Sequence, residues 1–538
     1  MTKFDAQDPS RTAGPNIGRR SLITGLAGSG LLLIGGPALL GACSSNSANG
    51  SPASGSSGGL SNKILQMAEG SGPETLDPHK AQGATNSYFL QNVFENLYTR
   101  DTSGNVVPQL ATSYTASPDG RQYIFKLRKG VTFHNGEPFN AAAVVYSIKR
   151  FVNPATQNIF AFYLAAYKNV TALDDYTVQL DLSTPCGNLI DNGAFVEMVP
   201  PKYIETHGDA YFAQHPVGTG PFQFKNNVTG QSWSVSRYEK YWGPKAGYAG
   251  LDVTIISADA SRLAALESGQ VDFITQVNPT DVSSIKSRGL TVASTFSGTA
   301  YGLFFNMTIP SAPWQKQAVR KALAYGIDRP ALRQALFEGY AIDFSKGLTQ
   351  YDPGYSLLTY PDPPYDKNKA KQMLVAAGYP NGFPIDIVGP ADGRFVNSAE
   401  VMQAVAGYWS DLGVKANVQA LAYAQWIDAL GPSGNYNGVA WSDESGIDPT
   451  TFYQEYFGPN AYDKRISSDP HMNSLLPTLT TATGSARATA CAAVATYNNE
   501  QGYMIPLYGD DVIYAMSGVN WTPWATNGQA YMANAKPA

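Results

Sequence analysis

From about residue 63 onward, short strand candidates alternate with helix candidates, and most of the helix candidates run into a glycine. A glycine just past a helix adopts the left-handed conformation that ends the helix without the steric cost of a Cβ. A chain in which strands and helices alternate is typical of the α/β class. We therefore expect an α/β fold for this part of the chain.

The pattern also places the individual elements. The strand candidates are Tyr123–Leu127, Val178–Leu182, Trp233–Tyr238, Asp252–Ile256, Val271–Ile274 and Tyr301–Asn306. The helix candidates are Ala141–Phe151, Ser261–Ser268, Gln315–Gly326, Arg329–Gly339, Asp366–Gly378 and Ser398–Gly413. In the first of these helices Val144, Ile148 and Phe151 share one face. A turn at Asp119–Gly120 predicts a hairpin within Leu110–Arg128.

The first 42 residues predict a cleaved export signal. Arg19 and Arg20 form a twin-arginine pair, and the apolar run Leu22–Leu40 that follows is diluted by glycines and a proline. A membrane-spanning helix needs about 20 mostly apolar residues without such breakers. A signal peptide at 1–42 is therefore the better interpretation, and a twin-arginine signal is typical of cargo that folds before export.

Cys43 follows Leu40, Gly41 and Ala42, a pattern that resembles a bacterial lipobox. We expect cleavage before Cys43 and a lipid on its thiol, which would anchor the chain to a membrane. The alternative is a chance cysteine after an apolar segment. Residues 43–62 consist mostly of Ser, Gly, Asn, Ala and Pro, which cannot bury enough apolar surface to fold. They predict a disordered tether.

Composition narrows the class of protein. A chain of 538 residues is too long to fold around one small hydrophobic core and suggests two or three domains. The net charge of −5 argues against a nucleic-acid partner, which would require a basic face. Aromatic residues make up 12% of the chain, which suits an aromatic-lined cavity or a tyrosine-rich surface. Apart from Cys43 there are Cys186 and Cys491, which form either a disulfide or two separate thiols.

The sequence shows no pattern for catalysis, a metal or a cofactor. The five histidines have no zinc-binding spacing, and no phosphate-binding loop is present. Gly218–Pro221 lacks the third glycine of a dinucleotide loop. The pairs Asp174–Asp175 and Asp510–Asp511 are expected in solvated turns. We therefore expect no catalytic residue, no metal and no cofactor, although glycosidase carboxylates would leave no local signature.

Several segments in order resemble the solute-binding receptors of peptide-type ABC importers, the extracellular family 5. The resemblance covers nearly all of the chain from Lys63 onward. The segments are Glu74–Pro78, Val93–Leu97, Val107–Ala111, Ser117–Gly120, Tyr123–Val131, Phe133–Ala141, Pro216–Phe222, Ser268–Asp272 and Val319–Arg329. We interpret them as markers of the fold and not as ligand contacts.

The resemblance implies a two-lobed periplasmic-binding-protein-like fold of the class II type, with an extra domain and a hinge between the lobes. Lobe I would be discontinuous, made of 63–94, 212–298 and 503–538. The extra domain would span 95–211, and lobe II would span 299–502. Segments that cross near Thr299 and Tyr503 would form the hinge.

The resemblance also implies charged ligand contacts. In peptide-binding relatives an Asp after a Trp holds the ligand ammonium, and here Trp441 precedes Asp443 and Glu444. We favour Asp443, with Glu444 as the alternative, because a buried ammonium needs such a partner; an acidic surface loop would look the same. Arg394 would read a ligand carboxylate, or it pairs with Glu400 on the following helix.

Aromatic and amide side chains complete the candidate ligand site. Trp441, Tyr423, Trp426 and Tyr88 are candidate cavity walls, and any of them would equally suit the core. Asn306 closes a strand candidate and would reach the ligand backbone from the junction of the lobes. These side chains would give recognition of the ligand backbone with broad specificity.

The resemblance implies a monomeric, lipid-anchored receptor at the outer face of the cytoplasmic membrane, in the cell envelope. It would capture a peptide or other small-molecule solute and deliver it to ABC permease subunits. An oligosaccharide is the main alternative ligand, because Trp and Tyr suit stacking on sugar rings, whereas a nickel chelate lacks a histidine cluster to support it. A secreted lipoprotein hydrolase is the alternative from another class, and no nucleophile or metal set supports it.

Overall fold

The computed structural model describes residues 60–538 apart from 82–86, 102–104, 191–195, 360–363, 392–394, 432–433, 435, 446–448, 459–468 and 524–529. The predicted signal peptide, Cys43 and most of the predicted tether at 43–62 lie outside the described residues and stay predictions. Within the described part of the chain, no helix is long and apolar enough to cross a membrane.

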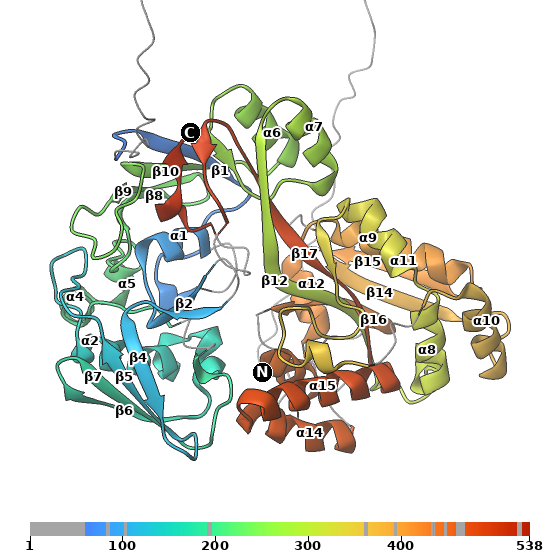
Figure 1. Cartoon of the computed structure of the whole chain (residues 1–538). Helices are drawn as coiled ribbons and strands as arrows, with labels where there is room; N and C mark the ends of the chain where they lie inside the picture. Colours follow the sequence, from blue (N-terminus) through green and yellow to red (C-terminus); the bar gives the residue numbers. More distant parts are fainter. Residues whose placement is uncertain are drawn as a thin grey trace, which may run out of the picture. The chain divides into compact units, whose positions relative to one another are not determined.

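A mixed sheet of eleven strands is the main element of the described chain (Figure 1). Its order is β15-β14-β16-β12-β17-β11-β1-β10-β9-β8, and β13 pairs with β17 beside this path. The strands are β1 (Ile64–Glu69), β8 (Phe222–Val228), β9 (Ser232–Arg237), β10 (Gly250–Ile255), β11 (Phe273–Ile274), β12 (Thr291–Phe305), β13 (Ala341–Asp343), β14 (Pro384–Pro390), β15 (Lys415–Leu421), β16 (Gly438–Ser445) and β17 (Met504–Met516).

Two long antiparallel strands, β12 and β17, join the halves of this sheet. One half, from β11 to β8, pairs on the outer side of β17, and the other half, from β16 to β15, pairs on the outer side of β12. The register between β12 and β17 shifts between Phe296 and Ala300, around Gly298, whose φ is +82°. A β-bulge of this kind bends and twists the strand locally, so the two halves meet at a bend.

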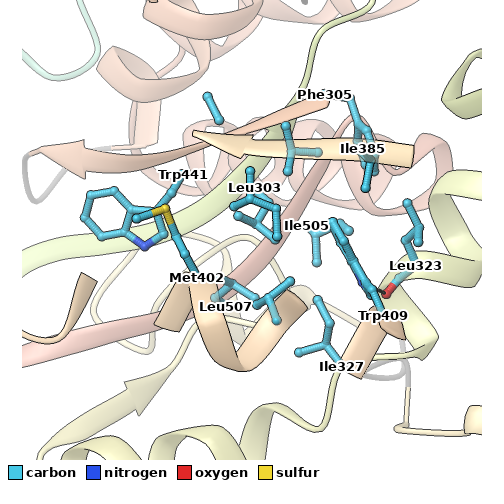
Figure 2. Packing of buried hydrophobic residues seen from close by; sticks show 14 of the residues in the cluster. Leu303, Phe305, Leu323, Ile327, Ile385, Met402, Trp409, Trp441, Ile505 and Leu507 are labelled. Carbon is cyan, nitrogen blue, oxygen red and sulfur yellow. Dashed lines mark hydrogen bonds between the residues drawn. The ribbon is translucent and has the colours of Figure 1, made fainter. Parts of the chain in front are cut away.

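Helices cover the half of the sheet that contains β12, β14 and β16. Figure 2 shows its largest hydrophobic cluster, in which Leu303 and Ile505 of the two long strands pack with Trp409. The Trp409 indole also donates to the carbonyl of Leu323 at 3.1 Å. The helices from here to the C-terminus are α8 (Gln317–Tyr325), α9 (Arg329–Phe337), α10 (Lys367–Ala376), α11 (Ser398–Ser410), α12 (Tyr423–Leu430), α13 (Pro449–Phe457), α14 (Pro470–Thr481) and α15 (Gly484–Gln501).

A separate four-stranded antiparallel sheet with the order β4-β5-β7-β6 has its own hydrophobic cluster with α2. Its predicted hairpin is confirmed, because β4 and β5 pair across Gly120, whose φ is +66°. The elements before α8, apart from the main sheet, are α1 (Ser87–Val93), β2 (Tyr98–Arg100), β3 (Val106–Pro108), β4 (Ala111–Ala116), β5 (Gln122–Leu127), α2 (Ala141–Val152), β6 (Tyr167–Asp174), β7 (Thr177–Leu182), α4 (Pro201–His207), α5 (Asp209–Phe212), α6 (Asp259–Glu267) and α7 (Val282–Ser287).

The predicted α/β class is confirmed, and most predicted elements exist. The glycine stops hold at Gly269, Gly378 and Gly413, all with positive φ. The helix α8 ends at Tyr325, just before Gly326 as predicted, but the left-handed conformation expected of this glycine is wrong, because its φ is −77°. The strand predicted at Tyr301–Asn306 covers only the last part of β12.

Buried charges fasten the α2 region to the N-terminal segment. The Arg150 guanidinium binds both oxygens of Asp77, at 3.0 and 2.5 Å, and one oxygen of Asp209 at 2.9 Å. Asp77 also caps the short helical turn that begins at Pro78 by accepting from the amide of His79. The Glu74–Pro78 segment is therefore a structural anchor, which agrees with its interpretation as a marker of the fold.

Candidate functional site

The carboxyl ends of three parallel strands place several predicted site residues at one edge of the sheet. β14 pairs in parallel with both β15 and β16. Tyr423 follows the end of β15, and Asp443 and Glu444 lie at the end of β16. Ligands of open α/β sheets bind outside the carboxyl ends of the strands. This edge is therefore the candidate site.

An aromatic cluster, made of Tyr301, Phe395, Tyr423, Trp426 and Trp441, lies at this edge. The Trp441 and Tyr301 rings stack with centroids 4.7 Å apart, and the Phe395 ring meets Trp441 edge-on at 5.2 Å. The Trp426 indole donates to the Trp441 carbonyl at 3.2 Å, and the Tyr423 ring lies 5.5 Å from that of Trp426. The structure thus brings three of the four predicted aromatic residues together.

Exposure divides this cluster into a base and a rim. Trp441 and Trp426 are buried, and Figure 2 shows Trp441 beside Met402 in the core. Tyr423 and Phe395 are only partly buried. A solute at this edge would therefore touch the rings of Tyr423 and Phe395, while the two tryptophans hold those rings in place.

The charged residues predicted for this edge are described only in part. The backbone of Asp443 pairs with Tyr301 of β12 and that of Glu444 with Ala300. The side chains of both acids, and all of Arg394, lie outside the described residues. Their roles as ligand contacts stay predictions.

Asp510, on β17 at the bend between β12 and β17, is a buried carboxylate that the sequence interpretation missed. It accepts hydrogen bonds from the Ser297 hydroxyl at 2.5 Å and the Tyr301 hydroxyl at 3.3 Å, on either side of the bulge in β12. Burial raises its pKa to about 6, more than those two donors lower it, and Asp511 next to it raises it further. The solvated turn expected for this pair of acids is wrong, because β17 runs through both residues.

Asn306 lies at the opposite end of β16 from Asp443. Its backbone amide donates to the carbonyl of Gly438, the first residue of β16. Its side chain is buried, donates to the Tyr436 carbonyl at 2.8 Å and accepts from the amide and hydroxyl of Thr308. These bonds fix the turn after β12, and the structure does not bring Asn306 to the aromatic cluster.

Tyr88 lies in a different hydrophobic cluster, on α1 beneath the other half of the sheet. Its neighbours include Glu69 at the carboxyl end of β1, which is fully buried and accepts from the Trp233 indole at 3.2 Å. Burial raises the pKa of Glu69 to about 8. No sequence pattern marks Glu69, since it is a single acid after an apolar run. The structure therefore separates Tyr88 from the other aromatic candidates.

The described residues contain no group of three or more His, Cys, Asp or Glu side chains that could hold a metal ion. A small cavity of about 20 Å³ lies between α8, α9 and β17, next to Arg329 and Pro506. That volume suits about one water molecule, so this cavity is too small for a solute. Cys186 and Cys491 belong to two different hydrophobic clusters.

Comparisons with known sequences identify related proteins. The model of the family described as bacterial extracellular solute-binding proteins, family 5 (Middle), matches residues 105–464. The glutathione-binding protein GsiB of Escherichia coli O1:K1 is 30% identical over 371 residues, which is 68% of this chain and 70% of GsiB.

Solved structures show the same fold. The periplasmic binding protein DppA from Helicobacter pylori, in complex with the peptide STSA, has a TM-score of 0.74 at 22% identity and covers 88% of this chain and 98% of its own. The binding protein AgaA from A. tumefaciens R10, in complex with agropinic acid, has a TM-score of 0.74 at 25% identity and covers 88% and 99%. The predicted two-lobed periplasmic-binding-protein fold is thereby confirmed.

Proposed function

Because this chain belongs to the bacterial extracellular solute-binding proteins of family 5, we propose that it captures a peptide-like solute between its two lobes and delivers it to an ABC permease. Proteins of this family bind solutes for ABC importers and are not enzymes, so this chain is a solute-binding protein and not an enzyme. The solute and the delivery step are the proposal.

The edge formed by β14, β15 and β16 carries this proposal. Tyr423 and Phe395 offer partly exposed rings, and Asp443 follows Trp441 on the strand that leads to the same edge. Rings and a carboxylate together suit a solute with an apolar part and an ammonium group. Asp510 adds a second carboxylate at the bend between β12 and β17.

An oligosaccharide is the second candidate solute. The rim of the aromatic cluster favours it, because partly exposed tyrosine and phenylalanine rings suit stacking on a sugar face as well as on a peptide side chain. A sugar would need hydrogen-bonding partners rather than a counter-charge. The effect of Asp443 on binding therefore separates the two candidates.

The same proposal includes location and domain organisation. The chain would be cut before Cys43, anchored by a lipid on that cysteine and act as a monomer beside its permease. A flexible tether keeps a receptor near its importer and raises the effective concentration for docking. Lobe I would comprise 63–94, 212–298 and 503–538, the extra domain 95–211, and lobe II 299–502.

Calorimetry of an Asp443→Ala variant tests the role of the peptide ammonium. Trialanine should bind the parent chain, and N-acetyl-trialanine should bind far more weakly because its ammonium is blocked. Asp443→Ala should abolish binding of trialanine, since the ammonium would be buried without a partner. Asp411→Ala is the matched control, because Asp411 pairs with Lys367 at the surface and should not affect binding. Unchanged trialanine affinity in Asp443→Ala, or binding of maltotriose alone, would contradict the peptide proposal.

A further inference from the structure

The loop after β7 touches the end of α14. The amide of Gly187 donates to the carbonyl of Thr480 at 2.8 Å. The last four carbonyls of a helix have no partner within the helix, and Thr480 is the second-last residue of α14. The loop therefore satisfies a helix-end carbonyl that belongs to a distant part of the sequence.

Gly187 fits this contact because it has no side chain. A Cβ at this position would lie 1.8 Å from the carbonyl oxygen of Ala482, far inside van der Waals contact, and 3.3 Å from Nη1 of Arg487. The φ of Gly187 is not in the left-handed region, so its own backbone would accept alanine without strain. The close approach to α14 is thus the one feature here that requires glycine.

The two sides of this contact belong to separate cores. Cys186 and Leu189 pack in the cluster of the four-stranded sheet, and the Tyr123 hydroxyl donates to the Cys186 carbonyl at 3.5 Å. The helices α14 and α15 pack in the cluster that contains Leu479 and Cys491. Each side is therefore held by its own cluster, and the hydrogen bond from Gly187 to Thr480 joins the two.

A buried carboxylate near the same junction is influenced by cations from both sides. Asp352 accepts from the amide of Thr349 at 2.5 Å and from its hydroxyl at 2.8 Å. Burial raises its pKa to about 6, while the positive charges of Arg100, at the end of β2, and Arg487, on α15, lower it. The attraction of the Asp352 carboxylate to both guanidinium groups therefore favours the state in which the hydrogen bond from Gly187 to Thr480 is formed.

We propose that the loop Cys186–Asn188 and the C-terminal end of α14 form a closure contact, which is present in the closed chain with or without solute and breaks when the chain opens to admit or release its solute. The predicted extra domain, 95–211, then takes part in holding the bound state. This proposal rests on the proposed function, because it assigns the contact to capture of a solute. Bending at β12 and β17 would separate the two sides of the contact while both long strands stay paired.

Gly187→Ala is the direct test, with Gly407→Ala as its matched control. A Cβ at Gly407, on α11, meets no atom within 4 Å. In small-angle scattering without solute, Gly187→Ala should increase the radius of gyration, and Gly407→Ala should leave it unchanged. Hydrogen exchange of residues 183–190 should become faster in Gly187→Ala alone. Scattering and exchange that match the parent in Gly187→Ala would overturn the proposal.

A second arm measures retention of a solute. After equal dialysis, Gly187→Ala should lose the co-purified solute roughly tenfold faster than the parent, about the effect of one lost hydrogen bond. Equal retention despite an opened chain would also overturn the proposal. If neither protein carries a solute, the proposed function fails, while the scattering arm still decides whether the contact exists. If Gly187→Ala does not fold, Arg100→Gln replaces it, with the same increase in radius expected and an unchanged radius contradicting the proposal.

Discussion

Glu69→Gln should stabilise the protein at neutral and alkaline pH and have little effect in acid. Glu69 is fully buried, and only one of its oxygens, Oε2, has a hydrogen-bond partner among the described residues, the Trp233 indole. A charged carboxylate in this position lacks the partners that would offset its lost hydration. Glutamine has nearly the same shape and cannot ionise, so it removes the ionisation without creating a cavity.

The magnitude follows from proton linkage. Burial raises the pKa of Glu69 from its ordinary 4.5 to about 8. Between these two values the unfolded chain has released this proton and the folded chain has kept it, so the free energy of unfolding falls as pH rises. Each pH unit in this window is worth about 1.4 kcal/mol. At pH 7 the ionisable side chain therefore costs about 3 kcal/mol, and at pH 4 it costs almost nothing.

Urea unfolding of the parent and Glu69→Gln at pH 4, 5.5, 7 and 8 measures this effect. Other buried carboxylates titrate in the same range, so the informative quantity is the difference between variant and parent at each pH. That difference should grow steadily in favour of Glu69→Gln from pH 4.5 to 8. The matched control is Glu500→Gln at an exposed position, for which the difference should not depend on pH. A pH-independent difference for Glu69→Gln would refute the reasoning.

Two further predictions concern buried charges. Asp510→Asn should raise the thermal midpoint at pH 8, where the free energy of unfolding gains about 3 kcal/mol, and should not raise it at pH 3.5. The reason is that burial raises the pKa of Asp510 from 3.8 to about 6, so that ionisation above this range destabilises the folded state. Equal shifts of the midpoint at both pH values would contradict this. Arg150→Ala should destabilise the protein by about 3–5 kcal/mol in urea unfolding, because Asp77 would be left buried and unpaired. Lys367→Ala, which breaks the exposed pair with Asp411, should leave the midpoint nearly unchanged, and a similar loss in both variants would count against the role of burial.

Local sequence patterns predicted the elements whose ends are set locally. The helix before Gly269 stops where a left-handed residue is needed, and the hairpin turns at Gly120 for the same reason. The helix α8 also ends just before Gly326, as predicted, but Gly326 itself is right-handed, because a glycine permits the left-handed conformation without requiring it.

Pairing between distant segments forms strands that local sequence patterns do not predict. The first part of β12, Thr291–Gly298, is rich in Ser, Thr and Ala and has no apolar alternation, yet it is a strand because β17 pairs with it. Asp510 and Asp511 are likewise in a strand because their backbones pair with Ala341 of β13 and Phe296 of β12. Hydroxyl groups of Ser297, Tyr301 and Ser294 then donate to the two carboxylates. Such partners are invisible to any local window.

The candidate site was predictable in part. Tyr423, Trp426 and Trp441 come together because three parallel strands end at one edge, which the alternation of strands and helices suggests but does not order. Tyr88 and Asn306 have equally suitable side chains, and the strand order places them elsewhere. The type of a side chain was therefore informative, whereas its position depended on the topology.

The central claim, that this chain binds a solute and releases it unchanged, is tested most directly by mass spectrometry after incubation with a tripeptide library. The native protein should retain one peptide per chain, and the peptides recovered after denaturation should have the masses of the intact library members. Recovery of cleaved peptides would contradict the claim, because it would make the chain a hydrolase. Retention of no peptide from the library would contradict the proposal of a peptide-like solute.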